Sequence, residues 1–170
     1  MPYLPGQHYL ETSRTNYFKR HYVVKETMEF QTLIKGKQAS ILRADGKILA
    51  RLEKDGMLYV YPEYAWDGPS GPTIDTHAFI LASCAHDVLY QMLRDSLLIN
   101  KYHFVDFMGN FYPGEYYRKF VELRALADKT MKELNLKYGM SRFRAWYTWL
   151  SVQTFGEKHA MPKELLNEEF

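Results

Sequence analysis

Four residues in the middle of the sequence carry side chains suited to acid–base chemistry. His86 and Asp87 are adjacent, and Tyr90 follows His86 by four residues. On a helix His86 and Tyr90 share one face, while Asp87 is rotated from them by about 100°. Asp128 stands among apolar residues on a later predicted helix, where an acid is costly unless it is paired. We therefore hypothesise that His86 is a general base and that Asp128 orients it.

This hypothesis predicts a specific geometry. A ring nitrogen of His86 should lie within about 3 Å of Asp128. The Tyr90 hydroxyl should lie near the same carboxylate, because a buried Tyr seeks a hydrogen-bond partner. The second ring nitrogen should face a pocket lined by Phe79, Ala82 and residues 68–71, where it can take a proton from water.

The same residues also allow a structural interpretation. A His on a half-buried helix is more often a satisfied core residue than a catalyst. Asp128 could be a surface acid that pairs with Lys132 at the i+4 position. Arg124, one turn before Asp128, could pair with Asp128 or with Asp87, and the sequence does not decide between them.

A Gly- and Pro-rich segment, residues 67–72, precedes the His-Asp helix. Asp87 beside the carbonyl groups of such a loop could bind a hard cation such as calcium. We expect Asp67 and Asp87 to converge there. Two nearby carboxylates repel each other, so the alternatives to a bound cation are a protonated acid or an Arg partner.

The elements that would position these residues give an α+β fold: a small antiparallel β meander followed by a three-helix unit. Residues 29–62 are rich in strand formers, with hairpin signals at Asp45-Gly46 and Asp55-Gly56. One domain would therefore span residues 29–156, with a meander (29–62), a Gly/Pro loop (63–72) and helices (73–156).

The helices are delimited by capping residues. The first is expected from a cap at Thr73 or Asp75 to about residue 98. The second should run from 114 to 137 before Gly139, and the third from a Ser141 cap to Gly156, where Trp146, Tyr147 and Trp149 would be core and interface residues. Residues 1–28 look like an extended arm and residues 157–170 like a polar tail with a short final turn.

Composition narrows the function classes. The chain of 170 residues has a net charge of only +2 and scattered basic residues, which argues against a nucleic-acid partner. Cys84 is the only cysteine, so an internal disulfide is impossible. No apolar run is long enough to span a bilayer and the start does not resemble a signal peptide, so we expect a cytoplasmic protein. The 14 tyrosines favour an interface.

The order of these motifs resembles a family of unknown function from tailed phages, prophages and some bacteria. The matching segments are Trp66–Pro72, Ala82–Tyr90 with its Ala-x-x-x-His-Asp-x-Leu-Tyr pattern, Arg124–Asp128 and Trp146–Gly156. They span roughly residues 25–156. Trp66 and Pro69 replace the Thr and Ala of the family pattern. This resemblance implies no established activity.

The His-Asp-x-x-Tyr helix also resembles that of secreted and parvoviral phospholipases A2. The resemblance implies that His86 is the base, Asp128 its orienting acid and Tyr90 a support of that acid. It further implies that calcium is bound by Asp87 and by the loop containing Asp67, Gly68 and Gly71. The disulfides and loop pattern of the secreted enzymes are absent from this sequence.

Three functions remain open. The first is a phage-type, metal-assisted lipid or ester hydrolase. The second is a non-enzymatic virion or tail component, bound to other phage structural proteins, in which the His, Asp and Tyr network is structural. The third is a host-directed binding protein. The expected location is the host cytoplasm, with incorporation into the virion under the second function.

Overall fold

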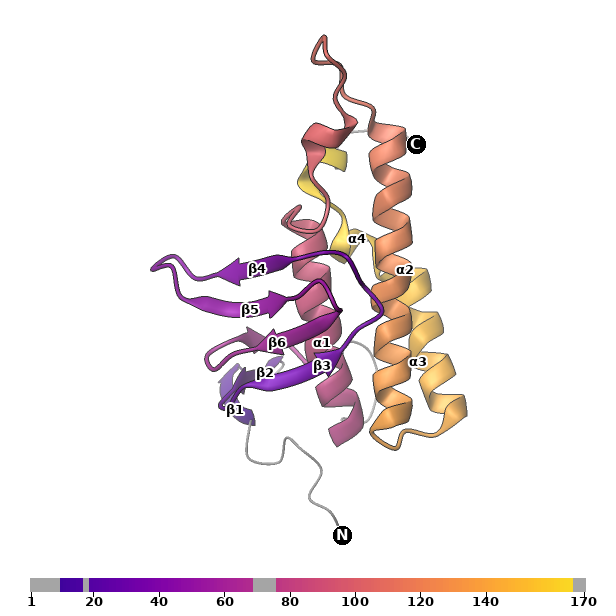
Figure 1. Cartoon of the computed structure of the whole chain (residues 1–170). Coiled ribbons are helices and arrows are strands. Elements are labelled where there is room, and N and C mark those ends of the chain that lie inside the picture. Colours follow the sequence, from indigo (N-terminus) through magenta and orange to yellow (C-terminus); the bar gives the residue numbers. More distant parts are fainter. Residues whose placement is uncertain (1–9, 17–18, 69–75, 167–170) are drawn as a thin grey trace.

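The computed structural model describes residues 10–16, 19–68 and 76–166, and it confirms the α+β fold (Figure 1). Strands occupy the first part of the chain and helices the second. The strands form one sheet of four and one of three, both within the described residues. Helix α1 (His77–Arg94) lies between the four-stranded sheet and α2 (Pro113–Lys137).

The four-stranded sheet contains β3 (Met28–Gln31), β4 (Ala39–Leu42), β5 (Ile48–Leu52) and β6 (Met57–Val60), all antiparallel. Its order is β3-β6-β5-β4. Strands β4, β5 and β6 form the predicted meander. The first strand of this sheet in the chain, β3, pairs with the last, β6. The predicted turns occur at Gly46 and Gly56, whose φ angles of 86° and 90° suit glycine.

Two strands of the three-stranded sheet lie where an extended arm was expected, and the third lies within the predicted Gly/Pro loop (63–72). Strand β1 (Leu10–Asn16) pairs with β2 (Lys19–Val24), and β2 pairs with β7 (Ala65–Trp66). The rings of Tyr22 and Trp66 stack with their centroids 5.4 Å apart. The arm prediction was therefore wrong for residues 10–16 and 19–24. Strand β1 pairs with its neighbour β2, but β2 also pairs with β7, which is distant in sequence, so local pattern gave no sign of that pairing.

The helix boundaries agree closely with the sequence prediction. Helix α2 ends before Gly139, whose φ is 91°, and the Ser141 side chain caps α3 (Arg142–Phe155) by accepting a hydrogen bond from the Arg144 backbone. Helix α1 is shorter than expected, because Ser96 adopts a positive φ of 57° after its last turn. The expected caps Thr73 and Asp75 lie outside the described residues.

Residues 157–166, predicted as part of a polar tail, pack on the domain. They contain a 3-10 turn η2 (Lys163–Leu165) and the short helix α4 (Glu157–Ala160). Ala160 and Leu165 are buried, and the Ser96 hydroxyl donates a hydrogen bond to Glu164. The remaining 3-10 turn, η1 (Lys101–Phe104), lies between α1 and α2.

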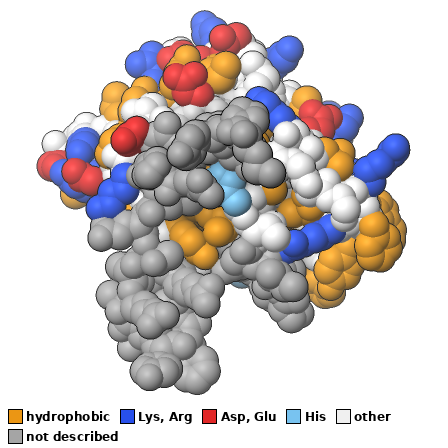
Figure 2. Space-filling view, turned by 90° about the horizontal axis from the view of Figure 1, so that it is seen from below, with side chains coloured by type: hydrophobic (Ala, Val, Ile, Leu, Met, Phe, Trp, Pro, Cys, Tyr) orange, Lys and Arg blue, Asp and Glu red, His pale blue; other side chains and the backbone are white. Residues whose placement is uncertain are grey.

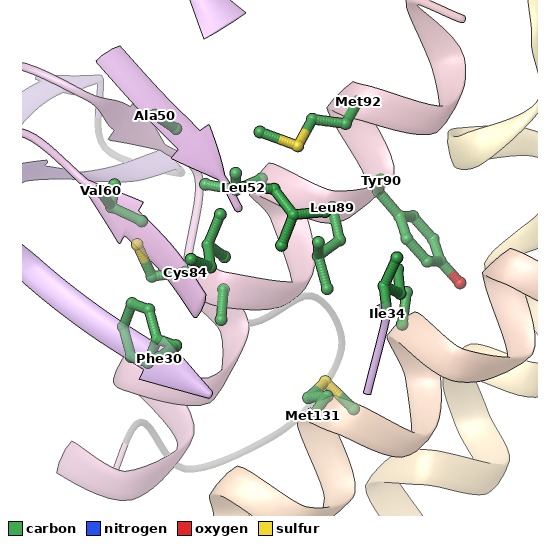
Figure 3. Packing of buried hydrophobic residues seen from close by; sticks show 14 of the residues in the cluster. Phe30, Ile34, Ala50, Leu52, Val60, Cys84, Leu89, Tyr90, Met92 and Met131 are labelled. Carbon is green, nitrogen blue, oxygen red and sulfur yellow. The ribbon is translucent and has the colours of Figure 1, made fainter. Parts of the chain in front are cut away.

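The core is divided by α1 (Figure 3). On one side of this helix, Cys84 and Leu89 pack with the buried strand residues Phe30, Leu52 and Val60. Tyr90 points away from the sheet, toward the side where α2 lies. The sheet therefore fixes α1 in place and leaves its opposite face to α2. None of the described helices is long and apolar enough to cross a membrane.

Candidate active site

The predicted pair of His86 and Asp128 is present between α1 and α2. The Nε2 atom of His86 lies 2.8 Å from Oδ1 of Asp128. Both side chains are buried, with Asp128 fully enclosed. This distance confirms the predicted contact between a ring nitrogen and Asp128. Because Asp128 is buried at a helix–helix contact, the alternative of a surface pair with Lys132 was wrong; the Lys132 ammonium instead lies over the Trp149 ring.

Two further side chains donate hydrogen bonds to the Asp128 carboxylate. The Tyr90 hydroxyl donates to Oδ1 at 2.6 Å, as predicted, and Nε2 of Gln153 on α3 donates to Oδ2 at 2.8 Å. An ionised carboxylate only accepts hydrogen bonds, so Nε2 of His86 carries its proton toward Asp128. In the neutral ring, Nδ1 of His86 then holds the lone pair.

Asp87 lies on the other side of the His86 ring. Its Oδ1 is 3.7 Å from His86 Nδ1, beyond direct hydrogen-bond length, and its side chain is 37% exposed, against 6% for His86. The His86 ring is thus enclosed, and Asp87 is the more exposed of the two acids beside it. Burial lowers the pKa of His86, but the bond to Asp128 and the proximity of Asp87 outweigh it, so the pKa is raised overall.

Tyr90 is held between His86 and the start of α4. Its ring centroid is 3.9 Å from that of His86, and its hydroxyl lies against Gly156, where a Cβ atom would collide with it. Burial and the neighbouring Asp128 carboxylate raise the pKa of Tyr90 far above its usual value. Tyr90 therefore remains a neutral hydrogen-bond donor to Asp128.

Arg124 connects this network to the C-terminal segment. Its Nη1 donates to Glu157 at 2.9 Å and its Nη2 to the Gln153 carbonyl at 2.7 Å. Its Nε is 3.7 Å from Asp128 Oδ2, a weaker contact. The sequence left Asp128 and Asp87 open as partners of Arg124. The structure places Arg124 near Asp128, but the acid closest to it is Glu157.

The predicted metal ligands are only partly described. Asp87 is beside His86; Asp67 is exposed after β7, and Gly68 is buried against the Tyr22 ring. Gly71 lies outside the described residues, as does part of the pocket predicted between Phe79, Ala82 and residues 68–71. In the described part of the chain, no three His, Cys, Asp or Glu residues are grouped to hold a metal.

Two residues of the network were not identified from the sequence. Gln153 had no signal, because its polar side chain lies on a helix with no strong apolar periodicity. Gly156 was identified only as a helix stop. Of the α3 aromatics predicted as core and interface residues, Trp146 and Tyr147 are about half exposed, so they are not core residues. Seen from below, hydrophobic side chains gather at the molecular edge on the α3 side (Figure 2).

Comparisons with known proteins add no relative: no family model, curated protein or solved structure matches the chain. The two resemblances drawn from sequence motifs therefore remain expectations.

Proposed function

We propose that the protein is a small hydrolase, of the phage type and similar in mechanism to phospholipase A2, in which His86 activates water to cleave an ester bond of a lipid. One observation carries this proposal. The His86 ring is held through Nε2 by Asp128 at 2.8 Å, while its Nδ1 is turned toward Asp87, the more exposed of the two acids. This is the arrangement expected of a general base with an orienting acid.

The proposed reaction follows from the tautomer. Nδ1 of His86 takes a proton from water as the water oxygen forms a bond to the ester carbonyl carbon. Asp128 stabilises the resulting imidazolium through Nε2–H, and Asp87 does so from the other side. The imidazolium then gives its proton to the departing alkoxide as the carbon–oxygen bond breaks. The products are a carboxylic acid and an alcohol, and no oxidant or second substrate is consumed.

Calcium is the proposed cofactor, with Asp87 as its carboxylate ligand. When bound, calcium would polarise the ester carbonyl. Calcium takes about six to eight oxygen ligands, and Asp87 is the one carboxylate that the described residues place at His86 Nδ1. The described residues alone thus do not complete a calcium site. The other proposed ligands are Asp67 and the carbonyls of Gly68 and Gly71.

The proposal is tested by fatty-acid release from phospholipid vesicles, measured with calcium, with magnesium and with a chelator. The wild type should hydrolyse the ester, and His86→Gln should be slower by at least about 100-fold. His103→Gln, at an exposed position away from this network, is the matched control and should retain full activity. No turnover by the folded wild type, or unchanged turnover in His86→Gln, would refute the hydrolase.

A second candidate is a non-enzymatic virion or tail component that uses the network to hold its helices together. The observation in its favour is that both Asp128 oxygens are fully used and that His86 is only 6% exposed. In that case His86→Gln should lower the melting temperature and abolish incorporation into particles, with no hydrolysis at any stage. Detection of the protein in purified particles would support this function.

A further inference from the structure

A hairpin at one end of the molecule presents two apolar side chains to solvent. It projects between η1 and α2 (Figure 1), and a bridge between Val105 and Phe111 closes it. Phe107 is 99% exposed and Met108 73% exposed. We call these two residues the apolar tip. An exposed single hydrophobe is ordinary, but two at the end of a projecting hairpin are suited to insertion into a partner.

The apolar tip is held in a defined shape by Asp106. This carboxylate accepts hydrogen bonds from the backbone N–H groups of Met108 and Asn110, at 2.8 and 2.9 Å, and from the Asn110 side chain at 2.8 Å. The Tyr112 hydroxyl adds a fourth at 3.2 Å. Gly109 completes the turn with a φ of 86°. The hairpin is therefore ordered before binding, which lowers the entropic cost of association.

A hollow of about 550 Å³ lies near the base of the same hairpin, and we call it the basal hollow. Its lining includes the apolar residues Leu97, Leu98 and Ile99 and the basic residues Lys37, Lys101 and His103. Glu164 also contributes a carboxylate, which accepts a hydrogen bond from Ser96. Leu98 and Ile99 are buried, so the accessible apolar surface of the basal hollow comes from Leu97 and Tyr102. Two lysines against one glutamate leave it a small excess of positive charge.

We propose that two copies of the chain associate through a two-fold axis, with the apolar tip of each inserted into the basal hollow of the other. The two features are complementary in polarity, apolar against apolar, and in charge. Asp106 at the tip would face Lys37 and Lys101 of the second copy. Its hydrogen bonds lower the pKa of Asp106, so it is ionised at neutral pH.

The placement of both features on one hairpin suits a closed dimer. When two hairpins lie side by side and antiparallel, each tip reaches the base of the other, and the same contact is made twice. The two Phe107 rings alone would bury about 300–500 Å². That area is below the roughly 1,200–2,000 Å² of a standard interface, so we expect a reversible dimer. The inference is independent of any activity at His86.

Sedimentation velocity of the full chain, from about 1 to about 500 μM, tests the proposal. The wild type should pass from monomer to dimer within this range. Phe107→Ser combined with Met108→Ser should weaken dimerisation at least about 100-fold, because each side chain is lost twice. The matched control is Phe143→Ser, which removes an aromatic of 75% exposure on α3 and should dimerise like the wild type.

Disulfide cross-linking provides a second measurement. Cys84 is buried, so new cysteines can be introduced without competition from it. Met108→Cys with Lys37→Cys should give a covalent dimer under mild oxidation, whereas Phe143→Cys with Lys37→Cys should not. A chain that stays monomeric at every concentration overturns the proposal. A dimer that persists in the Phe107→Ser/Met108→Ser variant also overturns it. A dimer that dissociates in Phe143→Ser overturns it too, because the interface would then lie on α3.

Discussion

The hydroxyl of Tyr90 occupies the space that a Cβ atom at Gly156 would fill. The glycine that ends α3 therefore makes room for the Tyr90 side chain. Any side chain at 156 would enter the space of the hydroxyl that donates to Asp128. The junction between α3 and α4 therefore belongs to the His86 network, although it contributes no functional group to it.

Gly156→Ala should destabilise the protein by about 1–3 kcal/mol, because the added Cβ atom overpacks this contact. Tyr90 must then move away from Asp128, so the ester hydrolysis proposed for His86 should slow as well. Chemical denaturation measures the first effect. Gly114→Ala is the control, since a Cβ atom there would meet nothing within 4 Å, and its stability should be equal or slightly higher. Equal stability of the two variants would contradict the packing argument.

Asp128→Asn should cost about 2–4 kcal/mol of stability, because the charged acceptor of three buried donors is lost. The pKa of His86 should fall at the same time, since burial then acts with Asp87 as the remaining acid near the ring. Urea denaturation and NMR titration of the imidazole would report the two effects. Asp87→Asn should also lower the pKa of His86, but because the Asp87 side chain is 37% exposed, it should cost less stability than Asp128→Asn.

The contribution of His86 to stability should decrease as the pH rises. Its folded-state pKa is raised above its unfolded value of about 6.5, so the protonated ring stabilises the fold fully below that value. This stabilisation is lost as the pH rises through the folded pKa. The melting-temperature difference between wild type and His86→Gln should therefore be largest near pH 6 and shrink toward alkaline pH. A difference that grows with pH would mean that burial holds the ring neutral.

Gly68→Ala should destabilise the junction between the small sheet and α1. Gly68 has a φ of 80°, and a Cβ atom there would enter the Tyr22 ring, which stacks on Trp66. We expect a loss of about 3 kcal/mol, from backbone strain and overpacking together. Gly36→Ala has a similar φ of 72° in open space and should lose only the strain, about 1–2 kcal/mol. Thermal denaturation of the two variants separates these effects.

The sequence predicted those features that local chemistry determines. The Asp-Gly turns at 45–46 and 55–56, the Ser141 cap and the stop at Gly139 each depend on a few adjacent residues. The pairing of His86 with Asp128 was also predictable, because a buried acid on an apolar helix face requires a partner.

Features that depend on distant pairing were not predictable in this way. Strand β2 finds its partner at Trp66, and β3 lies beside β6 and not beside its successor β4. Gln153 reaches Asp128 only because α3 folds back along α2, and Glu157 attracts Arg124 for the same reason. No periodicity within α3 indicated which of its polar residues would face the site.

The order of the network along the chain has a consequence for biosynthesis. The four-stranded sheet is complete within residues 28–60, and α1 can pack on it before α2 has been synthesised. The carboxylate at Asp128 arrives later, and Gln153 and Gly156 later still. A nascent chain that has not reached residue 153 would thus hold His86, Tyr90 and Asp128 without Gln153 and Gly156, so the network is completed only after residue 156 has been added.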